Sequence, residues 1–279
     1  MLIANILWYF FGDYMLKILN LGNDSRNLTA SEVIKEKLSV CEITDFNAKK
    51  QLDLHFDLYL FPIPSCKDKI YLNSSAVNIT LDELFLHIPN EAAVICAGKL
   101  RENCTDITSR DDFSYYNAVP TAEGAINLAI SLTDKTLCDS RILITGFGRV
   151  SKLLAHRLFP FSKNITVAAR KAGDLSLIES LGMTPITIDS LVENIGRFDI
   201  IFNTVPVRIF NQTILSAAKE NSVFIELASN ESGFDTKVIA SLPLIYRNAP
   251  GLPVRIAPIS AGKILADTVI NILRENKLI

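Results

Sequence analysis

The feature that most constrains the fold of this chain is a short, mostly apolar segment, residues 141–145, that ends at Gly146. An apolar run of this length is typical of a strand buried on both faces of a parallel sheet. A second glycine, Gly148, follows, and apolar side chains then recur at helical spacing over residues 147–159. A strand, a tight turn and a helix are therefore predicted here, and this order opens an α/β dinucleotide-binding domain.

The same alternation of strands and helices continues through the second half of the chain and, less regularly, through the first half. It predicts parallel sheets with helices on both faces, which is an α/β fold of two Rossmann-like domains. In the second half, further strands are predicted at residues 164–169, 199–203, 223–227 and 244–246, with helices at 174–181 and 212–219. In the first half, strands are predicted at residues 16–21, 58–61 and 92–96.

The length of 279 residues suits two domains of ordinary size. Connecting helices are predicted at residues 121–132, after Pro120, and at residues 260–273. The predicted parts are an N-terminal Rossmann-like domain for substrate or partner (1–118), a dinucleotide-binding domain with its connecting helix (119–259), and a C-terminal helix that crosses back (260–279).

Composition excludes several classes of function. The net charge of −2, with scattered Lys and Arg, gives no electrostatic basis for binding nucleic acid. The apolar residues 2–11 are too few to span a bilayer and lack the features of a signal peptide, so we expect a buried helix and no membrane role. With three histidines and no C-x-x-C motif, we expect no metal site and a cytoplasmic protein with free thiols at Cys41, Cys66, Cys96, Cys104 and Cys138.

The glycine turn is expected to hold the pyrophosphate of a dinucleotide. Gly146 permits the tight turn, Gly148 lets the backbone approach the ligand, and the helix N-terminus attracts negative charge. Ser151 replaces the third glycine of the usual pattern. The alternative is that the two glycines only terminate a strand. The expected cofactor-binding residues here are Gly146, Phe147, Gly148, Arg149 and Val150.

The end of the second strand indicates which dinucleotide is bound. NAD sites usually place a carboxylate there for the ribose 2′-hydroxyl. Here Ala169 is followed by Arg170 and Lys171, and the first carboxylate is Asp174. Because an arginine can pair with a 2′-phosphate, the sequence favours NADP over NAD. The alternative is that Arg170 and Lys171 are ordinary surface charges.

Two later strand ends are expected at the same edge, because ligands bind beyond the carboxyl ends of parallel strands. Asn203 and Thr204 are expected to hydrogen-bond the nicotinamide ribose, unless this segment is a plain loop. The residues expected to contact the cofactor are Asn203, Thr204, Val205 and Pro206 after one strand, and Leu227, Ala228 and Ser229 after the next.

Several segments together resemble one known family. They occur in the same order over residues 57–275, at residues 111–124, 146–149, 167–170, 203–206, 226–229, 249–253 and 257–262. The combination resembles the family of dipicolinate synthase A subunits. The resemblance implies a sporulation enzyme that oxidises a dihydrodipicolinate-type intermediate, a small dicarboxylate, with NADP as acceptor. It also implies that the partner is a flavoprotein-like B subunit.

The sequence departs from the family in three places. Family members begin with a strand and a Gly-Gly-Asp turn, whereas residues 2–9 correspond to the helix that follows and residues 16–21 to the second strand. We therefore expect an N-terminal domain that lacks its first strand, either because translation starts upstream or because the domain is incomplete. Val254 replaces a glycine and Ile259 replaces a lysine. Loss of that lysine affects substrate-carboxylate binding, for which Arg255 is the candidate replacement.

Substrate is expected in the cleft between the two domains, where the chemistry needs few protein groups. Asn117, Thr121 and Glu123 lie on the predicted loop-to-helix segment, and Glu123 is a candidate general base if burial raises its pKa. The alternative is that Thr121 caps the helix and Glu123 is exposed in its first turn. The candidate substrate residues on the other side are Gly251, Leu252, Pro253 and Arg255.

Three functional hypotheses remain open. The first is an NADP-dependent oxidoreductase of the dipicolinate type. The second is a nucleotide-binding regulatory or assembly subunit without its own turnover, and the third is an NAD(P) oxidoreductase that acts on another small acid. Association into a homo-oligomer is compatible with each of them.

Overall fold

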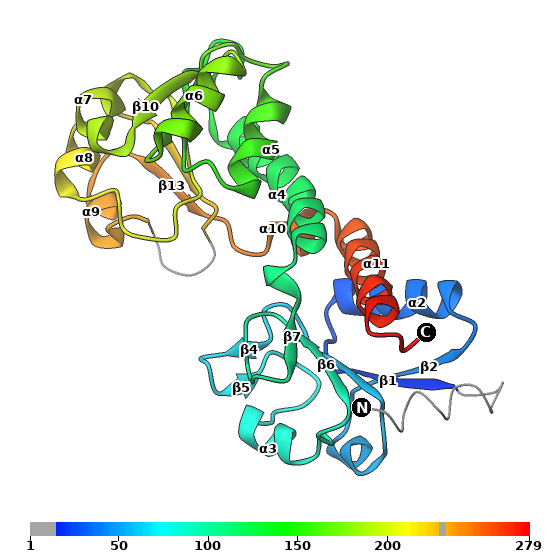
Figure 1. The fold of residues 1–279 in the computed structure, drawn as a ribbon. Helices are drawn as coiled ribbons and strands as arrows, with labels where there is room; N and C mark the ends of the chain where they lie inside the picture. The colour runs from blue at the N-terminus through cyan, green and yellow to red at the C-terminus, as the bar shows by residue number, and fades with distance from the viewer. Residues whose placement is uncertain (1–14, 229–232) are drawn as a thin grey trace. The chain divides into compact units, whose positions relative to one another are not determined.

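The computed structural model describes residues 15–228 and 233–279. They divide into two compact units (Figure 1). Unit 1 comprises the described residues of Met1–Tyr116 together with Ala257–Ile279, and unit 2 is Asn117–Ile256. Across residues 15–228 and 233–279, no helix is long and apolar enough to cross a membrane. The helix expected over residues 2–9 lies outside the described residues.

Unit 1 is built on a parallel five-stranded sheet with the order β2-β1-β3-β6-β7. Its strands are β1 (Leu16–Asn20), β2 (Cys41–Asp45), β3 (Leu58–Leu60), β6 (Ala93–Cys96) and β7 (Cys104–Asp106), with a small antiparallel pair of β4 (Cys66–Lys67) and β5 (Tyr71–Leu72). Its helices are α2 (Ser25–Lys37), α3 (Leu81–Leu86) and α11 (Pro258–Glu275), with short 3-10 turns at Lys49–Asp53 and Ile107–Ser109.

Alternating side chains of this sheet form two apolar layers, because successive residues of a strand point to opposite faces. Ile18 and Leu60 pack on one face with α2 and α11, which lie side by side (Figure 1). Leu19 and Tyr59 pack on the other face with α3. Gly262 of α11 permits the close approach to α2, since a Cβ there would lie 2.4 Å from Thr29 Cβ.

The expectation that unit 1 lacks its first strand was wrong. β1, which corresponds to the expected second strand, pairs in parallel with β2 on one side and β3 on the other. It is therefore an interior strand of the sheet, and the backbone groups on both its edges are paired. The turn after it contains Gly22 and Asp24, in the place of the expected Gly-Gly-Asp turn.

Unit 2 contains a parallel six-stranded sheet with the order β10-β9-β8-β11-β12-β13. This is the order of the Rossmann dinucleotide-binding fold, so the predicted α/β class is confirmed. The strands are β8 (Ile142–Thr145), β9 (Ile165–Ala169), β10 (Thr184–Thr187), β11 (Ile200–Asn203), β12 (Val223–Glu226) and β13 (Ile245–Asn248). The helices are α4 (Asp111–Leu132), whose residues 111–116 belong to unit 1, α5 (Arg149–Leu158), α6 (Ala172–Ser180), α7 (Leu191–Asn194), α8 (Gln212–Ser216), α9 (Thr236–Ser241) and α10 (Leu252–Ile256), with 3-10 turns at Ile188–Ser190 and Ile195–Arg197.

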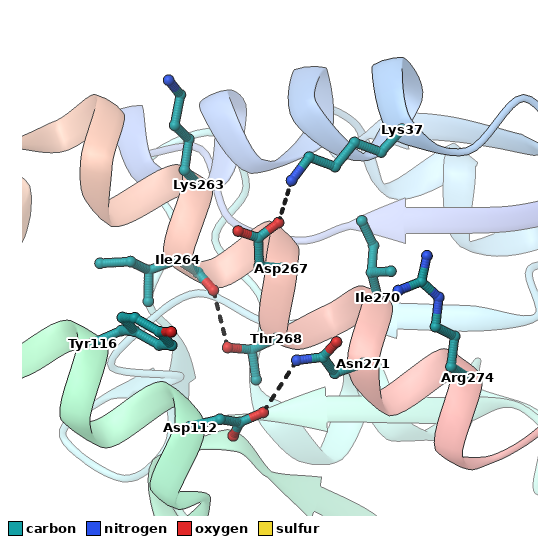
Figure 2. Close-up of a pocket in the computed structure, with 10 residues that line it drawn as sticks. All are labelled: Lys37, Asp112, Tyr116, Lys263, Ile264, Asp267, Thr268, Ile270, Asn271 and Arg274. Atoms are coloured by element: carbon teal, nitrogen blue, oxygen red, sulfur yellow. Dashed lines mark hydrogen bonds and ion pairs between the residues drawn. The ribbon is translucent and has the colours of Figure 1, made fainter.

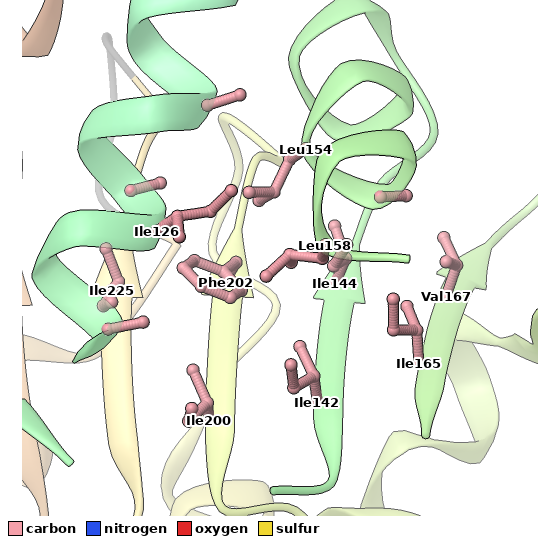
Figure 3. Packing of buried hydrophobic residues seen from close by; sticks show 14 of the residues in the cluster. Ile126, Ile142, Ile144, Leu154, Leu158, Ile165, Val167, Ile200, Phe202 and Ile225 are labelled. Atoms are coloured by element: carbon pink, nitrogen blue, oxygen red, sulfur yellow. The ribbon is translucent and has the colours of Figure 1, made fainter. Parts of the chain in front are cut away.

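The core of unit 2 also has two layers. Figure 3 shows Ile144 of β8 and Phe202 of β11 beneath Leu154 of α5 and Ile126 of α4. On the opposite face, Leu143, Ile201 and Phe224 pack against α7, α8 and α9. The central strands are buried on both faces, which is why they read as continuous apolar runs in the sequence.

Helix α4 begins ten residues earlier than expected, at Asp111 rather than after Pro120. Pro120 lies inside the helix, where it has no N–H to donate to the carbonyl of Tyr116. Thr121 is therefore not a helix cap: its hydroxyl donates to the Asn117 carbonyl oxygen at 2.8 Å. The acidic side chains of Asp111 and Asp112 in the first turn suit the positive end of the helix dipole.

Candidate dinucleotide-binding site

Four strands of unit 2 end at one edge of the sheet. Thr145 at the end of β8 pairs with Asn203 of β11, which in turn pairs with Glu226 of β12, and Ala169 ends β9 beside them. The segments that follow these strands are residues 146–150, 170–171, 204–206 and 227–228. The structure therefore brings the cofactor-binding segments expected from the sequence to a common edge.

The two glycines of the turn after β8 have different structural roles. Gly146 has a φ of +89°, and a Cβ there would lie 2.6 Å from Thr204 Oγ1. It is therefore required for the turn and for close packing against the loop after β11. A Cβ at Gly148 would have no atom of the described residues within 4 Å, and Gly148 itself is exposed, so the backbone is open at the surface.

The N-terminus of α5 has the properties of an anion-binding site. Gly148 is its N-cap and supplies no side-chain hydrogen bond, so the first N–H groups of the helix are not capped by a side chain. Ser151, in place of the third glycine, is buried, and its hydroxyl donates to the Gly148 carbonyl oxygen at 3.0 Å. Phe147 is buried, whereas Arg149 is exposed. The backbone of the turn fits a pyrophosphate without the third glycine.

A buried polar network lies beneath this edge. Thr145 Oγ1 donates to Asn203 Oδ1 at 2.6 Å, and Asn203 Nδ2 donates to Glu226 Oε1 at 2.8 Å. Asn203 also exchanges hydrogen bonds with the backbone of Val205. Its carboxamide is thus engaged within the protein and holds the loop, rather than being free for the ribose as expected.

Glu226 is a residue at this edge that sequence reasoning did not include among the candidates. It is 1% exposed and accepts hydrogen bonds from the N–H groups of Ala228 at 3.0 Å and Gly233 at 2.6 Å. Its carboxylate therefore ties the loop after β12 to the loop after β11. The signal in the sequence is a carboxylate at the end of an otherwise apolar strand. Charged side chains are rarely buried at such a position unless they are paired.

Arg170 and Lys171 lie beyond the end of β9 and are exposed. Neither pairs with a carboxylate in the part of the chain that the structure describes. Ala169 before them is buried in the core. Two uncompensated cations thus stand at the position where an NAD site usually has a carboxylate.

The remaining cofactor candidates lie on the loops after β11 and β12. Thr204 Oγ1 donates to the Thr145 carbonyl oxygen at 2.7 Å, and Pro206 is exposed. Leu227 and Ala228 are half-buried, and the Leu227 N–H donates to the Asn203 carbonyl oxygen. Ser229 lies outside the described residues, and its expected contact with the cofactor stays a prediction.

The expected substrate segment at residues 251–255 is only partly accessible. Gly251 has a φ of +66° and is exposed, as is Arg255. Leu252 and Pro253 are buried, and Leu252 belongs to the apolar core, where it packs beside Gly124 of α4. These two residues support the fold and are not accessible to a substrate, which corrects the expectation.

The expected catalytic residues lie within helix α4 and not on a loop. Glu123 has a side chain that is 56% exposed and pairs with Arg157, with Oε1 and Nε 3.4 Å apart. Glu123 therefore lacks the burial that would raise its pKa and make it a general base. Its side chain is exposed, as the alternative reading of the sequence expected. Asn117 is half-buried, and its carboxamide oxygen Oδ1 is buried without a hydrogen-bond partner among residues 15–228 and 233–279.

A groove of about 420 Å³ lies in unit 1, apart from these residues. Figure 2 shows Lys37 of α2 reaching Asp267 of α11 at 2.5 Å, and Asn271 of α11 reaching Asp112 of α4. A hydrogen bond from the Arg110 guanidinium lowers the pKa of Asp112. These charged groups mainly satisfy one another, which is the pattern of a structural surface.

The sheet order, the glycine turn after β8 and the open N-terminus of α5 are those of a Rossmann fold, which two-domain dehydrogenases of known structure share. The crystal structure of NAD-dependent formate dehydrogenase from Staphylococcus aureus in complex with NAD shares the fold. It matches with a TM-score of 0.57 and 18% identity over 93% of this chain and 94% of that chain. No family profile matches the chain.

The chain belongs to the family of dipicolinate synthase A subunits. It is 35% identical to the A subunit of dipicolinate synthase from Bacillus subtilis (strain 168) over 192 residues, which are 69% of this chain. The aligned region spans 65% of that relative's length. The crystal structure of the A chain of dipicolinate synthase from Bacillus subtilis matches with a TM-score of 0.83 and 26% identity, over 96% of this chain and 99% of that chain.

Proposed function

We propose that this chain is an NADP-dependent oxidoreductase that converts a dihydrodipicolinate-type intermediate to dipicolinate, as the A subunit of a dipicolinate synthase in sporulation. The observation that carries the cofactor choice is the pair of exposed cations, Arg170 and Lys171, next to the glycine turn. An arginine fork pairs with a 2′-phosphate, which NAD lacks. Membership in the family supports the substrate class and a B-type, flavoprotein-like partner subunit.

The proposed reaction removes a hydride and a proton from a dihydropyridine ring and leaves an aromatic product. When bound, NADP⁺ supplies the hydride acceptor. The chain mainly has to align two rings and hold two carboxylates. Gly146, Gly148 and the N-terminus of α5 would hold the pyrophosphate. The hydrogen-bonded network of Thr145, Asn203 and Glu226 would fix the loops beside it.

Residues of α4 would orient the substrate. The carboxamide oxygen of Asn117, buried without a partner, is the proposed acceptor for an N–H of the substrate ring. The Thr121 hydroxyl can still accept a hydrogen bond while it donates to Asn117. Because Glu123 is exposed, we assign it no role as a base, and the ring proton leaves to solvent.

The test is to purify the chain with and without a B-type subunit, and to follow the absorbance of NADPH as dihydrodipicolinate is supplied. NADPH formation by wild type that is lost in a Gly148→Val variant supports the proposal. Tight NADPH binding without turnover in either preparation would instead favour a regulatory or assembly subunit. Turnover with a different small acid only would favour the third hypothesis.

One observation favours the regulatory alternative. Ile259, in place of the family's lysine, is 63% exposed on α11, and Val254 is half-buried on α10. Neither can meet a carboxylate. The other argument for that alternative, a missing first strand, does not hold, since β1 is an interior strand that pairs with β2 on one side and β3 on the other.

A further inference from the structure

Arg26 stands out among the cations of unit 1 because it is buried. Its side chain is 6% exposed, and it is the one buried Lys or Arg among residues 15–228 and 233–279. Arg26 is the second residue of α2, which follows β1 directly. A buried guanidinium is costly unless an anion or several acceptors compensate it.

The partners of Arg26 within unit 1 are few. Its Nη2 donates to the Ile63 carbonyl oxygen at 2.6 Å, and this is the one hydrogen bond that its five N–H groups make to residues the structure describes. Its Nε is buried and has no hydrogen-bond partner among the described residues. The nearest carboxylate oxygen, Oδ2 of Asp24, lies 3.8 Å from Nη2, while Oδ1 of Asp24 caps α2 by accepting from Asn27 N. Burial accordingly lowers the pKa of Arg26 more than Asp24 raises it.

The position of Arg26 in the sheet topology points to a ligand. The sheet order β2-β1-β3 places the reversal of strand order between β1 and β3. In open α/β sheets, ligands bind beyond the carboxyl ends of the strands at this reversal. Arg26 lies on the helix after β1, and its partner Ile63 lies on the segment after β3. Its guanidinium therefore joins the two segments that flank the expected ligand position.

From this placement we infer that Arg26 binds a carboxylate of the dicarboxylate substrate, within unit 1, at the strand reversal between β1 and β3. The inference rests on the proposed function for the substrate class. An arginine meets a carboxylate through two parallel N–H···O bonds, for which Nε–H is one of the donors in the side-on arrangement. In this proposal Arg26 takes the place of Arg255 as the main cation for the substrate carboxylates, since Arg255 is an exposed residue of α10 in unit 2.

The test measures binding to the full chain by calorimetry, with dipicolinate and its uncharged diamide as probes. Wild type should bind dipicolinate about tenfold or more tightly than the diamide, as expected for one charge-assisted pair. Arg26→Gln should reduce this preference to nearly one, and Arg26→Lys should restore only part of it because lysine lacks the planar fork. Arg274→Gln, the matched loss of an exposed arginine in unit 1, should leave the preference unchanged.

Three results would overturn the inference: wild type that binds no dipicolinate, Arg26→Gln with unaltered preference, or equal weakening of both probes. A lower melting temperature with an unaltered preference would assign Arg26 a purely structural role at Ile63. NADPH affinity should not change in Arg26→Gln, because the glycine turn belongs to unit 2. Failure of turnover alongside Arg26-dependent binding would contradict the proposed function and leave this inference standing.

Discussion

Arg170 is the residue on which the choice between NADP and NAD depends. We expect Arg170→Ala to weaken NADPH about tenfold or more, because a hydrogen bond to a charged group is worth about 1.5–3 kcal/mol. NADH, which lacks the 2′-phosphate, should bind with nearly unchanged affinity. Calorimetric titration of both cofactors measures the difference.

The matched control for this variant is Arg141→Ala. It removes the same charge from unit 2, but Arg141 directly precedes β8, at the opposite end of that strand from the glycine turn. It should leave both affinities unchanged. If Arg170→Ala weakened NADPH and NADH equally, Arg170 would not read the 2′-phosphate, and the case for NADP would rest on Lys171 alone.

Glu226 is expected to support both cofactors alike. In Glu226→Gln, an amide NH₂ replaces one carboxylate oxygen and faces an N–H donor, so a buried donor loses its acceptor. The expected loss of stability is about 1–3 kcal/mol. Because the loops after β11 and β12 both depend on this carboxylate, NADPH and NADH should weaken by similar factors. Urea unfolding and calorimetry test the two effects.

Glu179→Gln is the control for Glu226, since Glu179 is an exposed carboxylate on α6 of the same unit. A Glu226→Gln variant of wild-type stability would show that the buried network does not hold the loops. Selective loss of NADPH alone would also contradict a positioning role, because the network joins the ends of β8, β11 and β12 and does not include Arg170.

At the scale of elements, the turn between β8 and α5 makes a prediction about fold and binding together. Gly148→Val should fold normally, because a Cβ at this position meets no atom within 4 Å. It should nevertheless abolish binding of NADPH and NADH, since the side chain would occupy the place of the pyrophosphate. Circular dichroism and calorimetry together check both statements.

The other glycine of this turn provides the contrast. Gly146→Ala places a Cβ 2.6 Å from Thr204 Oγ1 on a backbone with positive φ, so it should destabilise unit 2 by about 1–3 kcal/mol. Tight cofactor binding by a folded Gly148→Val variant would remove the main argument for a dinucleotide site at this edge.

The start of β11 is held by a carboxylate whose titration should be visible in the stability of unit 2. Asp199 accepts from the Arg141 N–H and from the ammonium groups of Lys135 and Lys219. Burial by itself would raise the pKa of Asp199, but these hydrogen bonds outweigh it and hold the pKa at about 2. Since the folded pKa lies below the usual value, the stabilisation is complete above about pH 4 and is lost between about pH 4 and 2.

We therefore expect Asp199→Asn to be about 2 kcal/mol less stable than wild type at neutral pH. The difference should shrink as the pH falls toward 2, when wild type loses its carboxylate charge. Urea titrations at neutral pH and at about pH 3 measure the difference in unfolding free energy between wild type and Asp199→Asn at each pH. A free-energy difference of equal size at both pH values would show that the charge of Asp199 does not contribute to stability.

The central strands were predictable from the sequence, whereas most edge strands were not. β8, β9, β11 and β12 are buried on both faces and read as apolar runs. β2 and β7 are the two edges of the first sheet and β10 is one edge of the second, and none was predicted. Their residues are mostly half-buried or exposed, and β10 contains Pro185, so the sequence lacks the apolar signal of a strand.

The site was predictable where a backbone motif marks it, at Gly146 and Gly148. It was not predictable where a role depends on burial. Arg26 looks like an ordinary surface charge in the sequence, and only the packing around it shows that it is buried. Glu226 is marked in the sequence only by its place at the end of an apolar strand. The true position of β1 was also missed, because the order of strands depends on pairing between segments far apart in the chain.

At the scale of the whole molecule, the two units differ in how the chain builds them. Unit 2 is one continuous segment, Asn117–Ile256. Unit 1 needs two separated segments, because α11 returns to cover the same face of the sheet as α2. The large apolar side chains of α11 that this packing buries are Leu265, Val269, Ile270, Ile272 and Leu273.

Truncation after Ile256 should therefore unfold unit 1 and spare unit 2. Without α11, unit 1 loses the burial of five large apolar side chains, which is worth on the order of 10 kcal/mol. The whole stability of a domain is about 5–15 kcal/mol, so unit 1 should not survive the loss. The truncated chain should bind NADPH with unchanged affinity, lose dipicolinate binding, and expose residues before Tyr116 to limited proteolysis. Cleavage confined to residues 117–256, with residues 15–116 protected, would show that α11 is not part of the fold of unit 1.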